Sequence, residues 1–229
     1  MIWLLLSAGP LLFLTAIIAA SLIASLAGTP SASIPQRVTG WMPHLLFLVQ
    51  VGLLLVLVLT TSLWRPVVNV GIAWQGNVVT PLLAGALSGG TLAFVYLRWI
   101  GPGLAYLQRH VGDYVPPGEL LPTLSSSVGL FFVANVLLAP VVEEVLYRGY
   151  AIPTLTGQAG LAGAMVISCI FFGLLHWPGG LWYMIATGVI AGGMFATLYV
   201  WQGTVLAPLT AHFVLNVVEF AVAWRNREG

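Results

Sequence analysis

Long apolar segments follow one another along almost the whole chain, and they constrain its fold more than any other feature. A helix that crosses a bilayer needs about 20 mostly apolar residues. Proline- and glycine-rich breakers separate the segments, and no repeat with a period of about 20–50 residues is visible. We therefore predict an all-α, polytopic transmembrane helix bundle of about seven spans, within a range of six to eight. The expected spans cover residues 2–27, 41–63, 79–100, 127–152, 159–177, 181–201 and 204–224.

Charged side chains are scarce. Among 229 residues there are seven basic side chains, all of them Arg, and six acidic ones, and 59% of the residues are hydrophobic. A soluble domain carries about a quarter of its residues as charged side chains, so a soluble fold and a disordered chain are both excluded. No basic patch is available to bind nucleic acid, and the single Cys169 cannot form an internal disulfide.

The first span resembles a signal peptide in its position. It lacks a positively charged start and is too long, so we expect a retained helix, with a cleaved signal as the alternative. The only substantial polar segment covers residues 101–123. We expect it at a membrane interface, in part as a short amphipathic helix.

The Arg residues also predict an orientation. With seven spans, five of them fall on one side of the membrane, which the positive-inside rule assigns to the cytoplasm together with the 101–123 loop and the C-terminus. These are Arg37, Arg98, Arg109, Arg225 and Arg227, and Arg65 and Arg148 fall on the other side.

An ionisable side chain within a span is costly and therefore indicates function. Glu143 and Glu144 follow an apolar stretch, and Arg148 lies four residues after Glu144, the spacing of an ion pair on one helix face. This pairing leaves Glu143 without a cation nearby in the sequence, as suits a base that takes a proton from water. A charge cluster at a helix end is the alternative interpretation.

His176 ends another apolar run. Glu143 and His176 lie on consecutive spans that should be antiparallel neighbours. A reversal near Ala159–Gly160 would bring them to equal depth, whereas a helix that ends at Pro153 leaves them about 9 Å apart in depth. An interfacial location for His176 is the alternative.

His212 and Asn216 lie four residues apart in the last span, so they share one helix face and must contact protein or water rather than lipid. Hydrogen bonding between helices, without catalysis, would also explain them. Glu219 is either a further partner or an interfacial charge, and we favour the interface. His44 is expected at the interface as well.

These polar residues could together hydrolyse an acyl bond. Glu143 could deprotonate a water held beside His176, while His212 and Asn216 donate hydrogen bonds to the oxyanion. Alternatively, Glu143, His176 and His212 could ligate zinc, which would activate a bound water. A serine mechanism is disfavoured because Ser125, Ser126 and Ser127 have no suitably spaced His and Asp, and no Gly-x-Ser-x-Gly motif occurs. The zinc-binding motif His-Glu-x-x-His is also absent from the sequence.

Three motifs resemble those of the CPBP family, which comprises CAAX proteases and bacteriocin-processing enzymes. The segment 143–149 (EEVLYRG) is similar to its Glu-Glu-x-x-x-Arg motif, 172–176 (FGLLH) to its Phe-x-x-x-His motif, and 212–216 (HFVLN) to its His-x-x-x-Asn motif. The motifs occur in the family's order, each in a separate apolar segment, and the resemblance covers roughly residues 123–220.

The resemblance implies a glutamic-type intramembrane endopeptidase related to the Ras-converting CAAX endopeptidase. It implies that Glu143 activates water beside His176, that His212 and Asn216 serve the oxyanion side, and that Glu144 and Arg148 support the site. We accordingly expect N-terminal helices with the interfacial loop over 1–122, a catalytic core over 123–224 and a tail over 225–229. No cofactor is expected, with zinc as the alternative.

The resemblance also implies a membrane-anchored protein or peptide substrate, cut near its C-terminus, in the lipid bilayer of a prokaryotic inner membrane. Bacteriocin immunity and processing of C-terminal sorting tails are narrower forms of this activity. A proton-coupled transporter and a non-catalytic scaffold are the alternatives from other functional classes.

Overall fold

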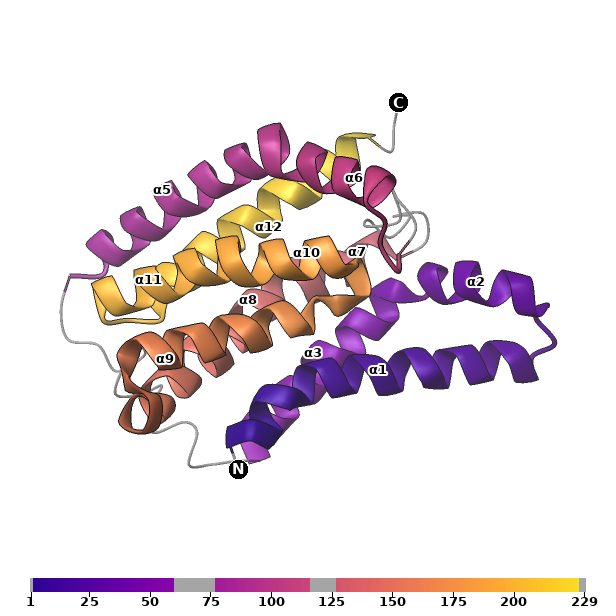
Figure 1. Ribbon diagram of the computed structural model, residues 1–229, viewed down its shortest axis with the longest axis horizontal. Helices are drawn as coiled ribbons and strands as arrows, with labels where there is room; N and C mark the ends of the chain where they lie inside the picture. The colour runs from indigo at the N-terminus through magenta and orange to yellow at the C-terminus, as the bar shows by residue number, and fades with distance from the viewer. Residues whose placement is uncertain (1, 60–76, 116–126, 227–229) are drawn as a thin grey trace.

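The computed structural model describes residues 2–59, 77–115 and 127–226, and helices make up nearly all of this part of the chain (Figure 1). The α-helices are α1 (Ile2–Leu26), α2 (Ile34–Gly40), α3 (Met42–Leu59), α5 (Val79–Val95), α6 (Gly101–His110), α7 (Val128–Phe131), α8 (Ala139–Glu144), α9 (Ile152–Leu175), α10 (Leu181–Ala186), α11 (Gly192–Gln202) and α12 (Leu206–Asn226). Short π-helical segments join several of them: η4 (Tyr96–Ile100), η5 (Phe132–Leu138), η6 (Val145–Ala151) and η8 (Thr187–Ala191). Two 3₁₀ turns are η1 (Ser31–Ser33) and η7 (Trp177–Gly179). The described residues contain no β-strand, which confirms the all-α prediction.

Six continuous helices within the described residues are long and apolar enough to cross a membrane, as a multi-pass membrane protein requires. The fourth runs from Val128 to Leu175 and has 48 residues, more than twice the length that a bilayer needs. It is broken at Gly160, whose φ of 68° and ψ of 168° are not helical. The two arms on either side of Gly160 correspond to the spans expected at 127–152 and 159–177.

The expectation that Pro153 ends the first of these helices is wrong. Pro153 lies in the first turn of α9, directly after the π-helical segment η6, and the helix continues to Gly160. A π-helical register change accommodates a proline that would otherwise interrupt the hydrogen-bond ladder. The chain therefore reverses its direction at Gly160, about midway between Glu143 and His176. A reversal at this point is what places the two residues at equal depth.

The arm after Gly160 packs back against the arm before it. The Ser168 hydroxyl donates a 2.7 Å hydrogen bond to the carbonyl of Tyr147. The rings of Tyr147 and Phe172 meet edge to face at 5.7 Å. These contacts fix the register between η6 and α9 and so place His176 relative to the two glutamates.

The helices α5 and α12 approach each other through small residues and lie side by side along one side of the bundle (Figure 1). A Cβ atom on Gly85 would lie 2.4 Å from the carbonyl oxygen of Ala207, and one on Gly89 would lie 2.4 Å from that of Ala211. Small residues spaced four apart on both helices allow this backbone contact, as is typical of membrane helices. The contact holds α12, and with it His212, at a fixed position.

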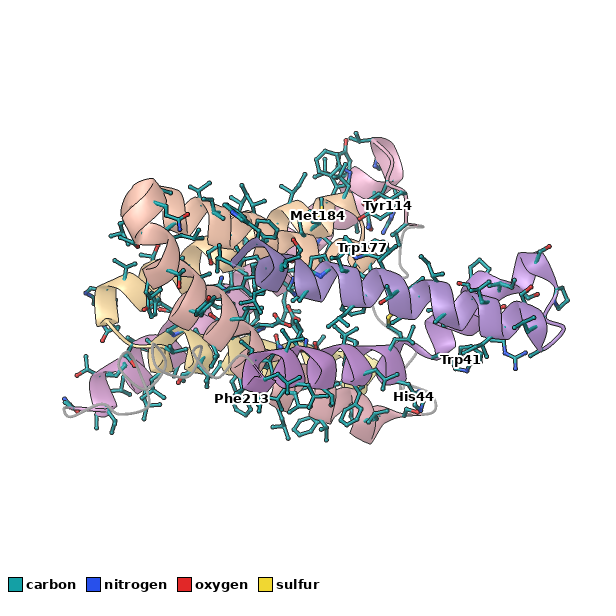
Figure 2. All side chains as sticks on the ribbon, turned by 90° about the horizontal axis from the view of Figure 1, so that it is seen from below. Trp41, His44, Tyr114, Trp177, Met184 and Phe213 are labelled. Carbon is teal, nitrogen blue, oxygen red and sulfur yellow. The ribbon has the colours of Figure 1, made fainter. Side chains whose placement is uncertain are left out.

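The N-terminal helices α1 and α3 cover another side of the bundle. Leu6, Phe13 and Leu53 belong to the main hydrophobic core. A Cβ atom on Gly9 would lie 2.6 Å from a methyl group of Leu175. The far end of α1 and the whole of α2 extend beyond the other helices in both views (Figures 1 and 2).

We expect Gly89→Ala to destabilise the protein, because the added methyl group must push α5 away from the α12 backbone. Overpacking of this kind costs about 1–3 kcal/mol. Gly90→Ala is the matched control, since a Cβ atom at Gly90 meets nothing within 4 Å. Thermal unfolding of the purified protein in detergent measures both variants, and equal melting temperatures for the two would contradict the proposed backbone contact.

Candidate active site

Glu143 lies in α8 and is only 3% exposed. Its Oε1 accepts a 2.7 Å hydrogen bond from the side-chain amide of Gln50 in α3. Its Oε2 is buried and has no hydrogen-bond partner among the described residues. One oxygen of this carboxylate is therefore held in place while the other is free to react.

Gln50 was not predicted as a site residue from the sequence. Its side chain is 1% exposed and comes from the N-terminal helices, outside the three motifs. The available signal was a single amide within the otherwise apolar segment 45–59, because a polar side chain in a span requires a partner.

Glu144 and Arg148 form the ion pair that their spacing predicts. The Nε of Arg148 lies 3.3 Å from Oε2 of Glu144, and both side chains are fully buried. Arg148 also donates a 3.0 Å hydrogen bond to the carbonyl of Gly192 and stacks over the ring of Phe172 at 4.2 Å. The guanidinium thus connects η6 with α9 and α11.

His212 completes this buried group. Its Nδ1 lies 2.8 Å from Oε1 of Glu144, which as a carboxylate oxygen accepts the hydrogen bond. The ring stacks on Phe195 at 5.0 Å. With the proton on Nδ1 fixed by Glu144, Nε2 of a neutral His212 is an acceptor, and it becomes a donor only when the imidazole is protonated.

His176 is oriented in the same way. Its Nδ1 lies 2.8 Å from the carbonyl oxygen of Phe172, one turn earlier in the chain. A carbonyl can only accept, so Nδ1 carries the proton and Nε2 has a free lone pair. Tyr183 contacts the ring edge to face at 5.9 Å.

Asn216 is anchored by a carbonyl that Pro140 leaves free. Within η5 the N–H of Ala139 donates to Ala134, five residues earlier. The next residue, Pro140, has no N–H to donate. The carbonyl of Asn135 instead accepts a 2.7 Å hydrogen bond from the side-chain nitrogen of Asn216. One amide hydrogen of Asn216 is thereby used, and the other is available to the site.

These side chains converge on one cavity of about 200 Å³ between the N-terminal helices and the core. It is lined by Glu143, His176, His212 and Asn216, the four predicted catalytic residues. A second, smaller cavity of about 40 Å³ has His176, His212 and Asn216 in its wall and extends between α5, η8 and α12. Glu144 and Arg148 line neither cavity, in agreement with a supporting position.

Glu219 and His44 are the two remaining residues for which the sequence suggested a location at the membrane interface. Glu219, favoured as an interfacial charge, instead lines both cavities, because it lies three residues after Asn216 on the same stripe of α12. His44 is exposed at the start of α3 (Figure 2). Several residues named from the sequence lie outside the described part of the chain: Arg65, Ser125, Ser126 and Arg227.

The polar segment after α5 is helical at its start and then closes over the turn that follows His176. The carboxylate of Asp113 accepts hydrogen bonds from the backbone N–H groups of Leu181 (2.8 Å) and Trp182 (3.4 Å). The hydroxyl of Tyr114 donates to the carbonyl of Trp177, and these two side chains lie close together in Figure 2. Asp113, in the loop after α6, therefore caps the start of α10.

The residues proposed as zinc ligands do not form a metal site in this arrangement. No group of three His, Cys, Asp or Glu side chains among the described residues is placed to hold a metal ion. His212 directs Nδ1 to Glu144, and Gln50 holds one oxygen of Glu143. The Nε2 atoms of His176 and His212 and Oε2 of Glu143 are not used by these hydrogen bonds, and the zinc alternative stays a prediction for the chelation test.

A comparison with known families gives one match that covers these positions. The family described as type II CAAX prenyl endopeptidase Rce1-like matches residues 125–218, which contain all four catalytic candidates and the Glu144–Arg148 pair. Residues 125–218 are thus similar to this family. The Rce1-like region indicates a membrane protease of the CAAX type. A search of curated proteins found no match, and a search of solved structures found none either.

The ion pair of the Rce1-like region yields a stability prediction. We expect Arg148→Met to lower the free energy of unfolding by about 3–5 kcal/mol, because it leaves the buried Glu144 carboxylate without its cation. The double variant Glu144→Gln/Arg148→Met should be more stable than Arg148→Met alone, since it removes both charges and keeps an acceptor for His212. Denaturant unfolding in detergent tests this order, and a double variant no more stable than the single one would contradict it.

The Asp113 cap yields a pH prediction. Partial burial raises the pKa of Asp113, but hydrogen bonds from the backbone N–H groups of Leu181, Trp182 and Tyr114 outweigh it and lower the pKa below its usual value. The cap is therefore fully present above the unfolded pKa of about 3.9 and is lost as the pH falls through the lower folded value. We expect the amides of Leu181 and Trp182 to exchange hydrogen more slowly in the wild type than in Asp113→Asn at pH 7.

That difference should disappear at a pH below the folded pKa of Asp113. Hydrogen exchange, corrected for the intrinsic rate at each pH, measures it. Equal protection of the two amides in wild type and Asp113→Asn at pH 7 would show that Asp113 does not stabilise the turn.

Proposed function

We propose that this protein hydrolyses a peptide bond of a membrane-anchored or lipidated protein or peptide, near its C-terminus, with a water activated by Glu143. One observation carries the proposal. Glu143, whose buried Oε2 has no hydrogen-bond partner among the described residues, lines the same cavity as His176 and His212, whose Nε2 atoms are free. The anchored side-chain amide of Asn216 lines this cavity too. The Rce1-like match over this region supports a protease.

In the first step, water attacks the carbonyl carbon of the scissile bond and transfers a proton to Oε2 of Glu143. Gln50 keeps the other oxygen in place, so the carboxylate is oriented before substrate binds. His176 accepts a hydrogen bond from the same water through Nε2 and aligns it. General base catalysis of this kind contributes about 10²–10⁴-fold to the rate.

The tetrahedral intermediate then needs donors for its oxyanion. Asn216 offers the amide hydrogen that it does not give to Asn135. His212 offers an Nε2 proton in its imidazolium form, which the Glu144 carboxylate stabilises through Nδ1. Glu143 finally returns its proton to the amine nitrogen as the C–N bond breaks, which yields a new carboxyl terminus and a free amine.

This mechanism uses only side chains of the chain, and we propose that it requires no metal ion. We further propose a multi-pass location in a prokaryotic inner membrane. The larger cavity lies between the core and the helices α1 and α3, which contribute Phe13 and Gln50 to its wall. Residues of the N-terminal helices thus contribute to substrate binding as well as the Rce1-like region.

The decisive variant is Glu143→Gln. It keeps an oxygen that accepts the hydrogen bond from Gln50 but cannot take a proton, so we expect peptide cleavage to fall by at least about 10²-fold with little change in melting temperature. Cleavage of a membrane-anchored peptide library by the purified protein, read by mass spectrometry, measures the loss. Equal cleavage by wild type and variant would overturn the proposal.

Two further outcomes of this assay are informative. Complete loss of wild-type activity after stringent chelation, restored by zinc, would overturn the metal-free mechanism. Proton flux in liposomes that depends on Glu143, without any cleavage, would identify a transporter instead.

A further inference from the structure

The polar groups that remain open in the larger cavity are mainly acceptors. Gln50 and Glu143 line it, and Oε1 of Gln50 and Oε2 of Glu143 are buried with no hydrogen-bond partner among the described residues. The Nε2 atoms of neutral His176 and His212 are acceptors too, because both rings carry their proton on Nδ1. A ligand that supplies donors or positive charge therefore complements this cavity.

Glu219 adds a second carboxylate to the same cavity. It lies three residues after Asn216 in α12 and belongs to the wall of both the larger and the smaller cavity. Among the described residues it takes part in no hydrogen bond or ion pair. The catalytic steps above leave Glu219 unused, although an uncompensated carboxylate in a bundle interior is costly.

Apart from the imidazole of His212, no side chain of the described residues brings positive charge to these carboxylates from the wall of the larger cavity. The chain contains no Lys, and none of the described Arg side chains lines the larger cavity. Arg148, the buried one, is engaged by Glu144, Gly192 and Phe172. Among the described residues, the cavity thus presents Glu143 and Glu219 without a Lys or Arg that could hold a substrate carboxylate.

We propose that Glu219 is a specificity-determining residue that receives a cationic side chain, Lys or Arg, of the peptide close to the scissile bond. The proposal rests on the proposed protease function and adds the charge of the preferred substrate. A peptide with Asp or Glu at that position meets like charge and is disfavoured. The free C-terminal carboxylate of a substrate accordingly remains outside this cavity.

The test uses the full-length protein in detergent and membrane-anchored fluorogenic peptides. Each peptide is made with Lys, Gln or Glu at one position within four residues on either side of the scissile bond. For wild type we expect kcat/KM to be at least about tenfold higher with Lys than with Glu at one of these positions. In Glu219→Gln the ratio of kcat/KM with the Lys peptide to kcat/KM with the Glu peptide should fall to near one. In Glu219→Arg the Glu peptide should become the better substrate.

Asp113→Asn serves as the control, because it removes a carboxylate that lies outside both cavities and should leave the Lys-to-Glu ratio unchanged. A ratio that is the same in wild type and Glu219→Gln, in a protein whose cleavage requires Glu143, would overturn this inference and leave the proposed function standing. Absence of Glu143-dependent cleavage for every peptide would overturn the proposed function itself. Binding of a labelled Lys peptide to Glu143→Gln, weakened at least about tenfold by adding Glu219→Gln, would support the charge preference without turnover.

Discussion

The buried carboxylate of Glu144 is the contact on which the rest of the site depends. It pairs with Arg148 in the next helical turn and accepts a hydrogen bond from His212 in the last helix. Arg148 in turn reaches Gly192 and Phe172. One carboxylate thus connects, directly or through Arg148, the segments that carry all three motifs, and in a low-dielectric interior such a network favours a single arrangement only if its charges are all paired.

Departures from regular helix geometry also help to position the polar side chains of the site. A regular α-helix satisfies its own carbonyls and offers nothing to a neighbour, whereas Pro140 and the π-helical segment before it release the carbonyl of Asn135 for Asn216. The break at Gly160 reverses the chain midway between Glu143 and His176. Two features of the site, the anchor of Asn216 and the relative depth of Glu143 and His176, thus come from places where a proline or a glycine interrupts the regular helix.

Much of this arrangement could be predicted from the sequence. Apolar length predicted the helical bundle, and the four-residue spacing predicted the Glu144–Arg148 pair, because both depend on contacts that are local along the chain. Gln50, Glu219 and the Asp113 cap could not be placed in the same way. Gln50 meets Glu143 across 93 residues of sequence and Asp113 meets Leu181 across 68, so only the packing of the helices brings them together. The role of Pro153 was mistaken for a related reason, since a π-helical turn before it cannot be recognised from hydropathy alone.

The division between paired and unpaired polar atoms explains how a charged site can exist within an apolar bundle. The inner atoms, namely the Glu144 carboxylate, the Arg148 guanidinium and the Nδ1 atoms of both imidazoles, are bonded within the protein and hold the geometry. Two of the buried atoms without a hydrogen bond among the described residues, Oε2 of Glu143 and Oε1 of Gln50, belong to residues of the larger cavity, whereas others, such as the hydroxyl of Tyr147 and Oε1 of Gln108, do not. A bound peptide supplies N–H groups to the two cavity atoms and, on our proposal, a positive charge to Glu219. Glu219 and Glu143 line the same cavity, so a substrate recognised by the first carboxylate is held beside the second, which activates water.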